Sequence, residues 1–168
     1  MVEKLTIAER IDRKLKAILT AIDGITECHR QDFRADDLIP GHAYLFDEGE
    51  NAQEGGMSNE ANCTTSVQYE VIIGVCIALS GEADEIPAAV VKRWHGKIHA
   101  AVVADPDLTD EFSQSLCNDM GGIEYLASNS LQLEADQTEI FAVRRYRFPY
   151  QMYRNDPYAG PGITEQTA

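Results

Sequence analysis

The stretch of residues 67–79 alternates strictly, with an apolar side chain at every second position. Since successive side chains of a strand point to opposite faces of a sheet, this pattern predicts one long strand with a fully apolar face. The other face begins polar and becomes small or apolar toward the end of the segment. At ~3.3 Å per residue, such a strand is about twice as long as usual. It needs a layer of helices on its apolar face, and its half-polar face should be partly wet or covered by a neighbour.

Two segments have the signatures of helices that would form this layer. Residues 6–22 begin with Thr6 and Glu9, the spacing of a capping box, and then carry isoleucine and leucine at three- and four-residue intervals. Pro87 suits the first turn of a second helix, which is predicted to run to about Ala104.

Shorter strands are predicted at residues 25–31, 43–46, 123–127 and 131–134, and a last long strand at 138–152. The resulting order, α-β-β-β-α-β-β, favours a two-layer α+β fold. We expect a mixed, mostly antiparallel sheet of about five strands with both helices packed on one face. We expect one domain over residues 1–158, an acidic loop at 47–62, and a disordered Gly/Pro-rich tail at 159–168.

The chain is strongly acidic, with a net charge of −14 over 168 residues, and residues 32–60 carry eight acids against one base. Phosphate contacts dominate affinity for nucleic acids, so specific nucleic-acid binding is not expected. No apolar run approaches the ~20 residues of a membrane span. The N-terminal sequence lacks the apolar region of a signal peptide, so we expect the chain to stay in the compartment where it is made, without membrane contact.

Patterns that could carry chemistry are weak. His95 and His99 lie four residues apart on the second predicted helix, but the metalloprotease glutamate is missing, and a partly exposed helix face explains them better. The four cysteines form no C-x-x-C pair, and Cys28 and His29 would lie on opposite faces of a strand. The sequence therefore predicts no catalytic residues, no cofactor and no metal site.

The closing strand is aromatic and basic. Arg145 and Arg147 share one face, and Arg144 shares the other with Tyr146 and Tyr150. Arginine and tyrosine are enriched in the cores of protein interfaces. The candidate subunit-interface residues are Arg144, Arg145, Tyr146, Arg147 and Tyr150 on this strand, with Asp47, Glu48 and Glu50 in the acidic segment.

Two interpretations of these arginines stay open. They either meet acidic side chains of a neighbouring subunit or pair with acids of the same subunit. Complementary acidic and basic surfaces on identical subunits would favour a head-to-tail ring.

The layout resembles the phage tail terminator, or tail completion, proteins of long-tailed phages, which are also called minor tail protein U-like proteins. The resemblance rests on the helix 7–22, the strand 67–79 and the helix ending Ala100-Ala-Val-Val-Ala-Asp-Pro-Asp-Leu108. The closing Arg145-Tyr-Arg-Phe and Asp156-Pro157 are similar to a "Y-R-T…D-P" ending of such proteins. The resemblance spans most of the chain. This chain departs from the smaller members of the family by its acidic insert and its polar tail.

The resemblance implies a structural, non-enzymatic phage or prophage protein of virion assembly. Such a protein forms a homo-oligomeric, hexameric ring that ends polymerisation of the tail tube and joins it to the head–neck complex. Its partners would be its own copies, the tail tube protein and head–neck connector proteins. It would lie in the virion at the tail end proximal to the head, and in the bacterial host cytoplasm during assembly. The alternative is a non-virion α+β ligand-binding module or small enzyme with an unidentified site.

Overall fold

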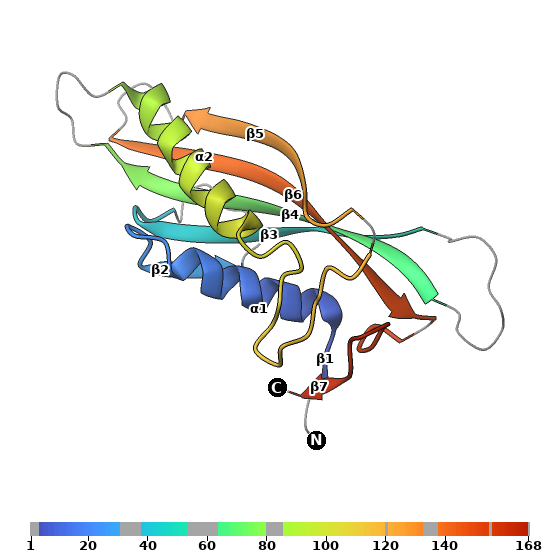
Figure 1. Ribbon diagram of the computed structural model, residues 1–168. Coiled ribbons are helices and arrows are strands. Elements are labelled where there is room, and N and C mark those ends of the chain that lie inside the picture. The colour runs from blue at the N-terminus through green and yellow to red at the C-terminus, as the bar shows by residue number, and fades with distance from the viewer. Residues whose placement is uncertain are drawn as a thin grey trace.

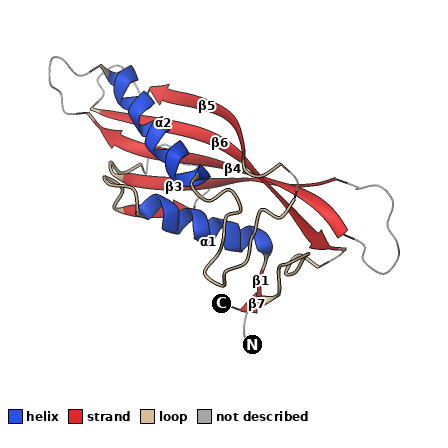
Figure 2. Cartoon of the chain, in the orientation of Figure 1, coloured by secondary structure: helices blue, strands red, loops and turns tan. Residues whose placement is uncertain are grey.

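The computed structural model describes residues 4–30, 38–53, 64–79, 86–119, 121–132, 138–154 and 156–167. Its elements follow one another as shown in Figures 1 and 2. In chain order they are β1 (Lys4–Leu5), α1 (Ile7–Thr20), β2 (Glu27–Arg30), β3 (His42–Gln53), β4 (Thr64–Ala78), α2 (Pro87–Val103), β5 (Glu124–Gln132), β6 (Glu139–Tyr153) and β7 (Gln166–Thr167).

A five-stranded sheet in the order β2-β3-β4-β6-β5 forms the main layer. The central pair of this sheet is β4 and β6, which run antiparallel and pair from Thr64 opposite Tyr153 to Ala78 opposite Glu139. Only β2 and β3 run parallel. Both helices cover the same face of this sheet (Figure 1). The predicted α+β fold, with a mixed, mostly antiparallel sheet of five strands and two helices on one face, is confirmed.

The apolar face of β4 meets the helices as its alternation predicts. The side chains of this face are all buried, namely Val67, Tyr69, Val71, Ile73, Val75 and Ile77. The apolar stripe of α1 packs on them, with no exposure at Ile7, Ile11, Leu15 and Leu19. The capping box of Thr6 and Glu9 closes the first turn of α1 in both directions, as predicted.

The opposite face of the sheet, which we call the open face, carries no helix of the described part of the chain (Figure 1). One end of it holds a second small core of Tyr44, Cys76 and Phe141, with Leu38 and Val143 packed against it. The half-polar second face of β4 is therefore partly covered by this chain itself.

The strand predicted at residues 43–46 is longer in the structure, where it forms β3. Residues 47–53 of the predicted acidic loop belong to β3, which continues past a bulge between Asp47 and Gly49. Pairing with β4 extends from Ala43 to Gln53, so backbone hydrogen bonding holds the acidic and polar residues after Phe46 in a strand. Residues 54–62 of the predicted loop lie outside the described residues, as do Asp32, Asp36 and Asp37 of the acidic segment.

The two strands predicted at 123–127 and 131–134 form one strand, β5. The register with β6 shifts at a bulge between Tyr125 and Ala127, and pairing continues on both sides of the bulge. Residues 133–134 lie outside the described part of the chain.

The C-terminal segment differs from the disordered tail that its composition predicted. Residues 159–167 pack against the domain: Ile163 is buried, and β7 pairs with β1. Gly160 lies so close to β6 that a Cβ atom there would come within 2.0 Å of the Gln151 carbonyl oxygen. Glycine content, an indicator of disorder in the sequence, here permits close backbone contact.

Among the described residues, neither helix is long and apolar enough to cross a membrane.

Candidate subunit interface

Three of the predicted interface residues of β6 point toward the helices. Arg144 is 8% exposed, and its Nη1 donates a hydrogen bond to the backbone carbonyl of His95 on α2. Its guanidinium lies 4.2 Å from the ring centroid of Tyr125, at cation–π distance. Arg144 is thus a link between sheet and helix inside the subunit.

Tyr146 and Tyr150 are fully buried on the same side. The Tyr150 hydroxyl donates a 2.6 Å hydrogen bond to Oε1 of Glu50, which fixes the end of β3 to β6. Burial raises the pKa of Tyr146 to about 12, and burial together with the Glu50 hydrogen bond raises the pKa of Tyr150 even further. Both phenols stay neutral at any physiological pH and serve the core.

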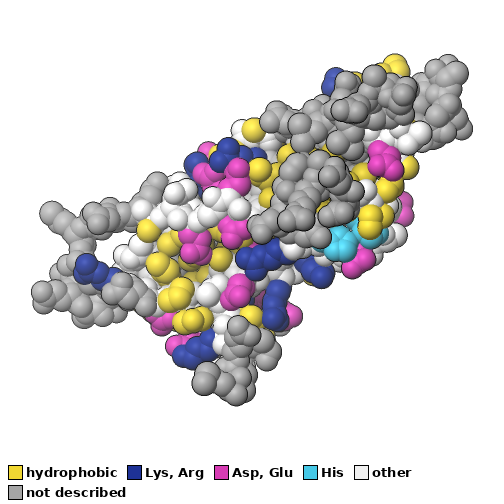
Figure 3. Space-filling model, turned by 180° about the vertical axis from the view of Figure 1, so that it is seen from behind, with side chains coloured by type: hydrophobic (Ala, Val, Ile, Leu, Met, Phe, Trp, Pro, Cys, Tyr) yellow, Lys and Arg dark blue, Asp and Glu magenta, His cyan; other side chains and the backbone are white. Residues whose placement is uncertain are grey.

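Arg145 and Arg147 lie on the open face and bind acidic side chains of their own chain. Arg145 contacts Oε2 of Glu48 through Nε at 2.5 Å and Oε2 of Glu70 through Nη2 at 2.6 Å. Arg147 contacts Oε1 of Glu70 through Nη2 at 2.8 Å and Oε2 of Glu124 through Nη1 at 2.9 Å. We call these five residues the open-face ion network. Figure 3, seen from this side, shows basic and acidic side chains interspersed with hydrophobic ones.

Glu70 is the centre of the network because the β4–β6 register puts it directly opposite Arg147. Its side chain is only 10% exposed, whereas those of Arg145 and Glu124 are 44% and 55% exposed. Hydrogen bonds from Arg147, and then from Arg145, hold the pKa of Glu70 below its ordinary value, although burial opposes them. The network therefore has a fixed, ionised centre and a solvated rim.

Asp47 points the other way, because successive side chains of a strand point to opposite faces. Its Oδ2 lies 3.7 Å from Nη2 of Arg30, which is also 3.0 Å from Oδ2 of Asp12 on α1. The predicted acidic partner surface is therefore divided: Glu48 reaches the open face, while Asp47 and Glu50 serve contacts on the helix side.

The structure thus removes Arg144, Tyr146 and Tyr150 from the side chains that a partner could reach, because all three are buried. For Arg145 and Arg147, it favours the second interpretation, pairing within the subunit. Their partners Glu70 and Glu124 were not among the acidic residues predicted from the sequence. The alternation of β4 placed Glu70 on its half-polar face, but only strand register reveals what it opposes.

Within the described residues, one group of three side chains is arranged to hold a metal ion: Glu27, His29 and His42. The helical pair His95 and His99 does not form such a group. His99 instead lies against the rings of Tyr125 and Tyr146, and its Nδ1 is 3.3 Å from the Tyr146 hydroxyl.

The described cysteines are unsuited to nucleophilic chemistry. Cys28, Cys76 and Cys117 are free and buried. Burial raises the pKa of their thiols to about 11, 11 and 12, so almost no thiolate forms near neutral pH. Cys63 lies outside the described residues.

The fold and these contacts define a two-layer α+β domain in which both described helices lie on one face of the sheet. Neither a scan against models of protein families nor a search of curated proteins finds a match to this chain. A proposal of function therefore rests on the resemblance in layout and on the surfaces described above.

Proposed function

We propose that this chain is a structural phage or prophage tail protein that forms a ring at the end of the tail tube. The ring terminates tube polymerisation and joins the tube to the head–neck complex, and the chain has no enzymatic role. Its partners are its own copies in a hexamer, the tail tube protein and head–neck connector proteins. It acts at the tail end proximal to the head, after assembly in the host cytoplasm.

The main support for this proposal is the accessible ion network on the open face of the sheet. A stable ring needs a surface that each subunit presents to the next. Neither described helix lies on the open face, and the rim of its ion network is accessible, with Arg145 and Glu48 at 44% and 30% exposure. Arginine is enriched in interfaces, and polar rims surround their buried centres. The network is preorganised within one subunit, which lowers the entropic cost of presenting it to another.

The charge of the chain fits a channel that DNA passes through. A net charge of −14 repels phosphate and disfavours DNA retention at the ring surface. The proposed ring therefore binds protein and not nucleic acid.

Light scattering coupled to size-exclusion chromatography tests assembly directly. We expect a mass that rises from monomer to hexamer with concentration, or when tail tubes are added. A chain that stays monomeric at every concentration and also fails to bind tube ends would overturn the proposal, and would favour the ligand-binding alternative.

A charge swap tests the open face itself. Glu48→Arg combined with Arg145→Glu keeps an ion pair between positions 48 and 145 and leaves Arg147 on Glu70, but it removes the Arg145–Glu70 contact and reverses the charges shown to a partner. We expect this variant to fold and to lose assembly.

A swap of the remote pair Lys4→Glu and Glu165→Lys, whose side chains are 48% and 45% exposed, is the matched control and should assemble normally. Normal assembly of the Glu48/Arg145 swap would exclude the open face as the contact.

A further inference from the structure

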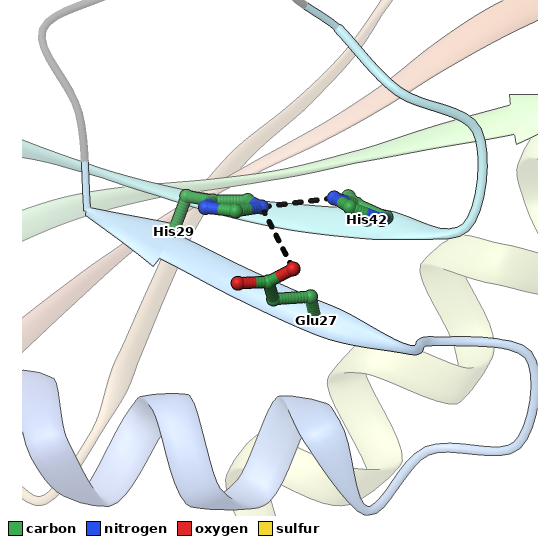
Figure 4. Close-up of side chains that lie close together, drawn as sticks. All are labelled: Glu27, His29 and His42. Atoms are coloured by element: carbon green, nitrogen blue, oxygen red, sulfur yellow. Dashed lines mark hydrogen bonds and ion pairs between the residues drawn. The ribbon is translucent and has the colours of Figure 1, made fainter.

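The side chains of Glu27, His29 and His42 converge on one point of the open face (Figure 4). Glu27 and His29 are two residues apart on β2 and so share a face. The parallel register of β2 and β3 puts His42 directly beside Glu27. Cys28, between the first two, points into the core on the other side and is only 1% exposed. Strand pairing therefore gathers three possible ligands and excludes the thiol.

The distances between these ligand atoms suit a single small ion. Nε2 of His29 is 2.8 Å from Nδ1 of His42 and 3.8 Å from Oε2 of Glu27, and all three atoms lie within 4.8 Å of one another. Zinc binds imidazole nitrogen and carboxylate oxygen at about 2.0–2.2 Å, so two tetrahedral ligands are about 3.3 Å apart. The distances of 2.8 Å and 3.8 Å lie on either side of this value, so small side-chain movements would bring these two pairs of atoms to the separation that a bound ion needs.

The donor set selects the class of metal. Two imidazoles and one carboxylate are ligands of zinc sites that keep an open fourth position. Imidazole favours zinc and related transition metals, whereas calcium and magnesium require sets of oxygen ligands. The helical pair His95 and His99 brings no third ligand of this kind among the described residues.

The surroundings hold the two rings in place. The His29 ring lies 5.0 Å from the His42 ring and 5.4 Å from the ring of Tyr44, in both cases within 30° of parallel. Tyr44 is itself buried, and its hydroxyl accepts a 2.8 Å hydrogen bond from the Ile39 backbone N–H. The side chains of His29 and Glu27 remain 27% and 57% exposed, so an ion can enter from solvent.

We propose that Glu27, His29 and His42 form a binding site for a divalent transition metal ion, with zinc as the best fit, that fastens β2 to the edge of the sheet. Both facing nitrogens must be unprotonated to bind the ion, so each neutral ring then carries its proton on its other nitrogen. Without metal, the same two nitrogens share a proton in a hydrogen bond. The proposal is independent of ring assembly.

Isothermal titration calorimetry tests this site. The chain is first treated with a chelator and is then titrated with zinc chloride at pH 7.5. We expect one ion per chain. Losing a ligand should weaken binding at least about tenfold, since even outer-shell losses reach this size. His29→Gln and His42→Gln should each show this loss, as should Glu27→Gln. Cobalt(II) should give visible absorption bands in the wild-type protein that the two histidine variants lack.

His99→Gln is the matched control for unspecific binding to histidine and should bind zinc like the wild type. Magnesium chloride should produce no binding. Absence of zinc binding, or equal affinity in His29→Gln, His42→Gln and wild type, would overturn the site. Unchanged affinity in Glu27→Gln would overturn the three-ligand set. Circular dichroism of each variant without metal separates a lost ligand from a lost fold.

Discussion

Two groups of ion pairs lie on opposite sides of the molecule and differ in their exposure to water. On the helix side, Arg10 of α1 pairs with Asp110, and their side chains are 2% and 4% exposed. On the open face, the side chains of Arg145 and Arg147 are 44% and 27% exposed. Both groups pair arginine with a carboxylate, so the difference in environment decides what each group does.

The buried pair holds three parts of the chain together. Besides Asp110, Arg10 donates to the Thr164 carbonyl at 3.0 Å and to Oε1 of Gln114 at 2.7 Å. It thereby joins α1, the segment after α2 and the C-terminal segment. A buried charge that loses its partner is strongly destabilising, whereas solvent and salt screen exposed pairs. The helix side therefore contributes to stability, and the open face keeps charges that can exchange partners.

The largest effect should follow from breaking the buried pair. Asp110→Ala leaves the Arg10 guanidinium buried without its carboxylate, which should cost about 3–5 kcal/mol in the free energy of unfolding. Urea unfolding measures this loss. A cost below about 1 kcal/mol would show that water reaches Arg10 and would remove the contrast between the two regions.

A second buried acid on the helix side should make stability depend on pH. Asp12 is 5% exposed and accepts a 2.8 Å hydrogen bond from the Tyr69 hydroxyl. Burial raises its pKa to about 6 from 3.8. The folded chain therefore binds this proton more tightly than the unfolded chain does. The ionised carboxylate costs stability above pH 6, and this cost disappears as the pH falls from about 6 toward 4.

Asp12→Asn should remove that dependence. At 1.36 kcal/mol per pKa unit, the variant should gain up to about 3 kcal/mol at pH 7.5 and almost nothing at pH 4. Unfolding midpoints measured across this range give the comparison. Asp23→Asn, at an exposed position, should leave the pH profile unchanged. Equal profiles for Asp12→Asn and wild type would mean that Arg30, 3.0 Å away, fully compensates the burial.

The open face also contains a tightly packed part, and Gly74→Ala should disrupt it. A Cβ atom at Gly74 would lie 2.0 Å from Cζ of Phe141, whose side chain is buried over it. Displacing that ring should cost about 1–3 kcal/mol. Thermal unfolding should show the decrease. Gly96→Ala on α2 has no atom within 4 Å and should instead stabilise the protein by about 0.5–1 kcal/mol.

The smallest effect should come from the rim of the open-face ion network. Glu124 is 55% exposed and contacts Arg147 alone in the network, so Glu124→Gln should change the free energy of unfolding by less than about 1 kcal/mol. High salt should reduce even this difference. A loss as large as that of Asp110→Ala would mean that the open face is a structural region like the helix side.

Local patterns in the sequence were sufficient to predict the main helices and strands and which of their faces are buried. The spacing of apolar residues after Thr6 predicted α1, and the alternation in residues 67–79 predicted which side of β4 is buried. Alternation also separated Arg144 from Arg145 and Arg147 correctly. Such patterns arise from the geometry of a single helix or strand, so they need no knowledge of the rest of the chain.

Contacts between distant segments could not be predicted in this way. Glu70 meets Arg147 through the β4–β6 register, and His29 meets His42 through parallel pairing across a thirteen-residue separation. The Gly/Pro-rich end was expected to be disordered because its composition is polar, but Ile163 and Gly160 find complementary surfaces on the folded domain. Composition indicates whether a segment would be ordered in isolation, but it does not show whether the folded domain offers a surface on which the segment can pack.

The pairing of β1 with β7 brings Lys4 opposite Thr167. Antiparallel partners have Cα atoms about 4.5–5.5 Å apart, so a linker of a few residues would join these two positions without strain. Circular permutants with new ends elsewhere in the chain are therefore accessible. Any fusion or label attached near either position would project from the same corner of the molecule, where Figure 1 shows β1 and β7.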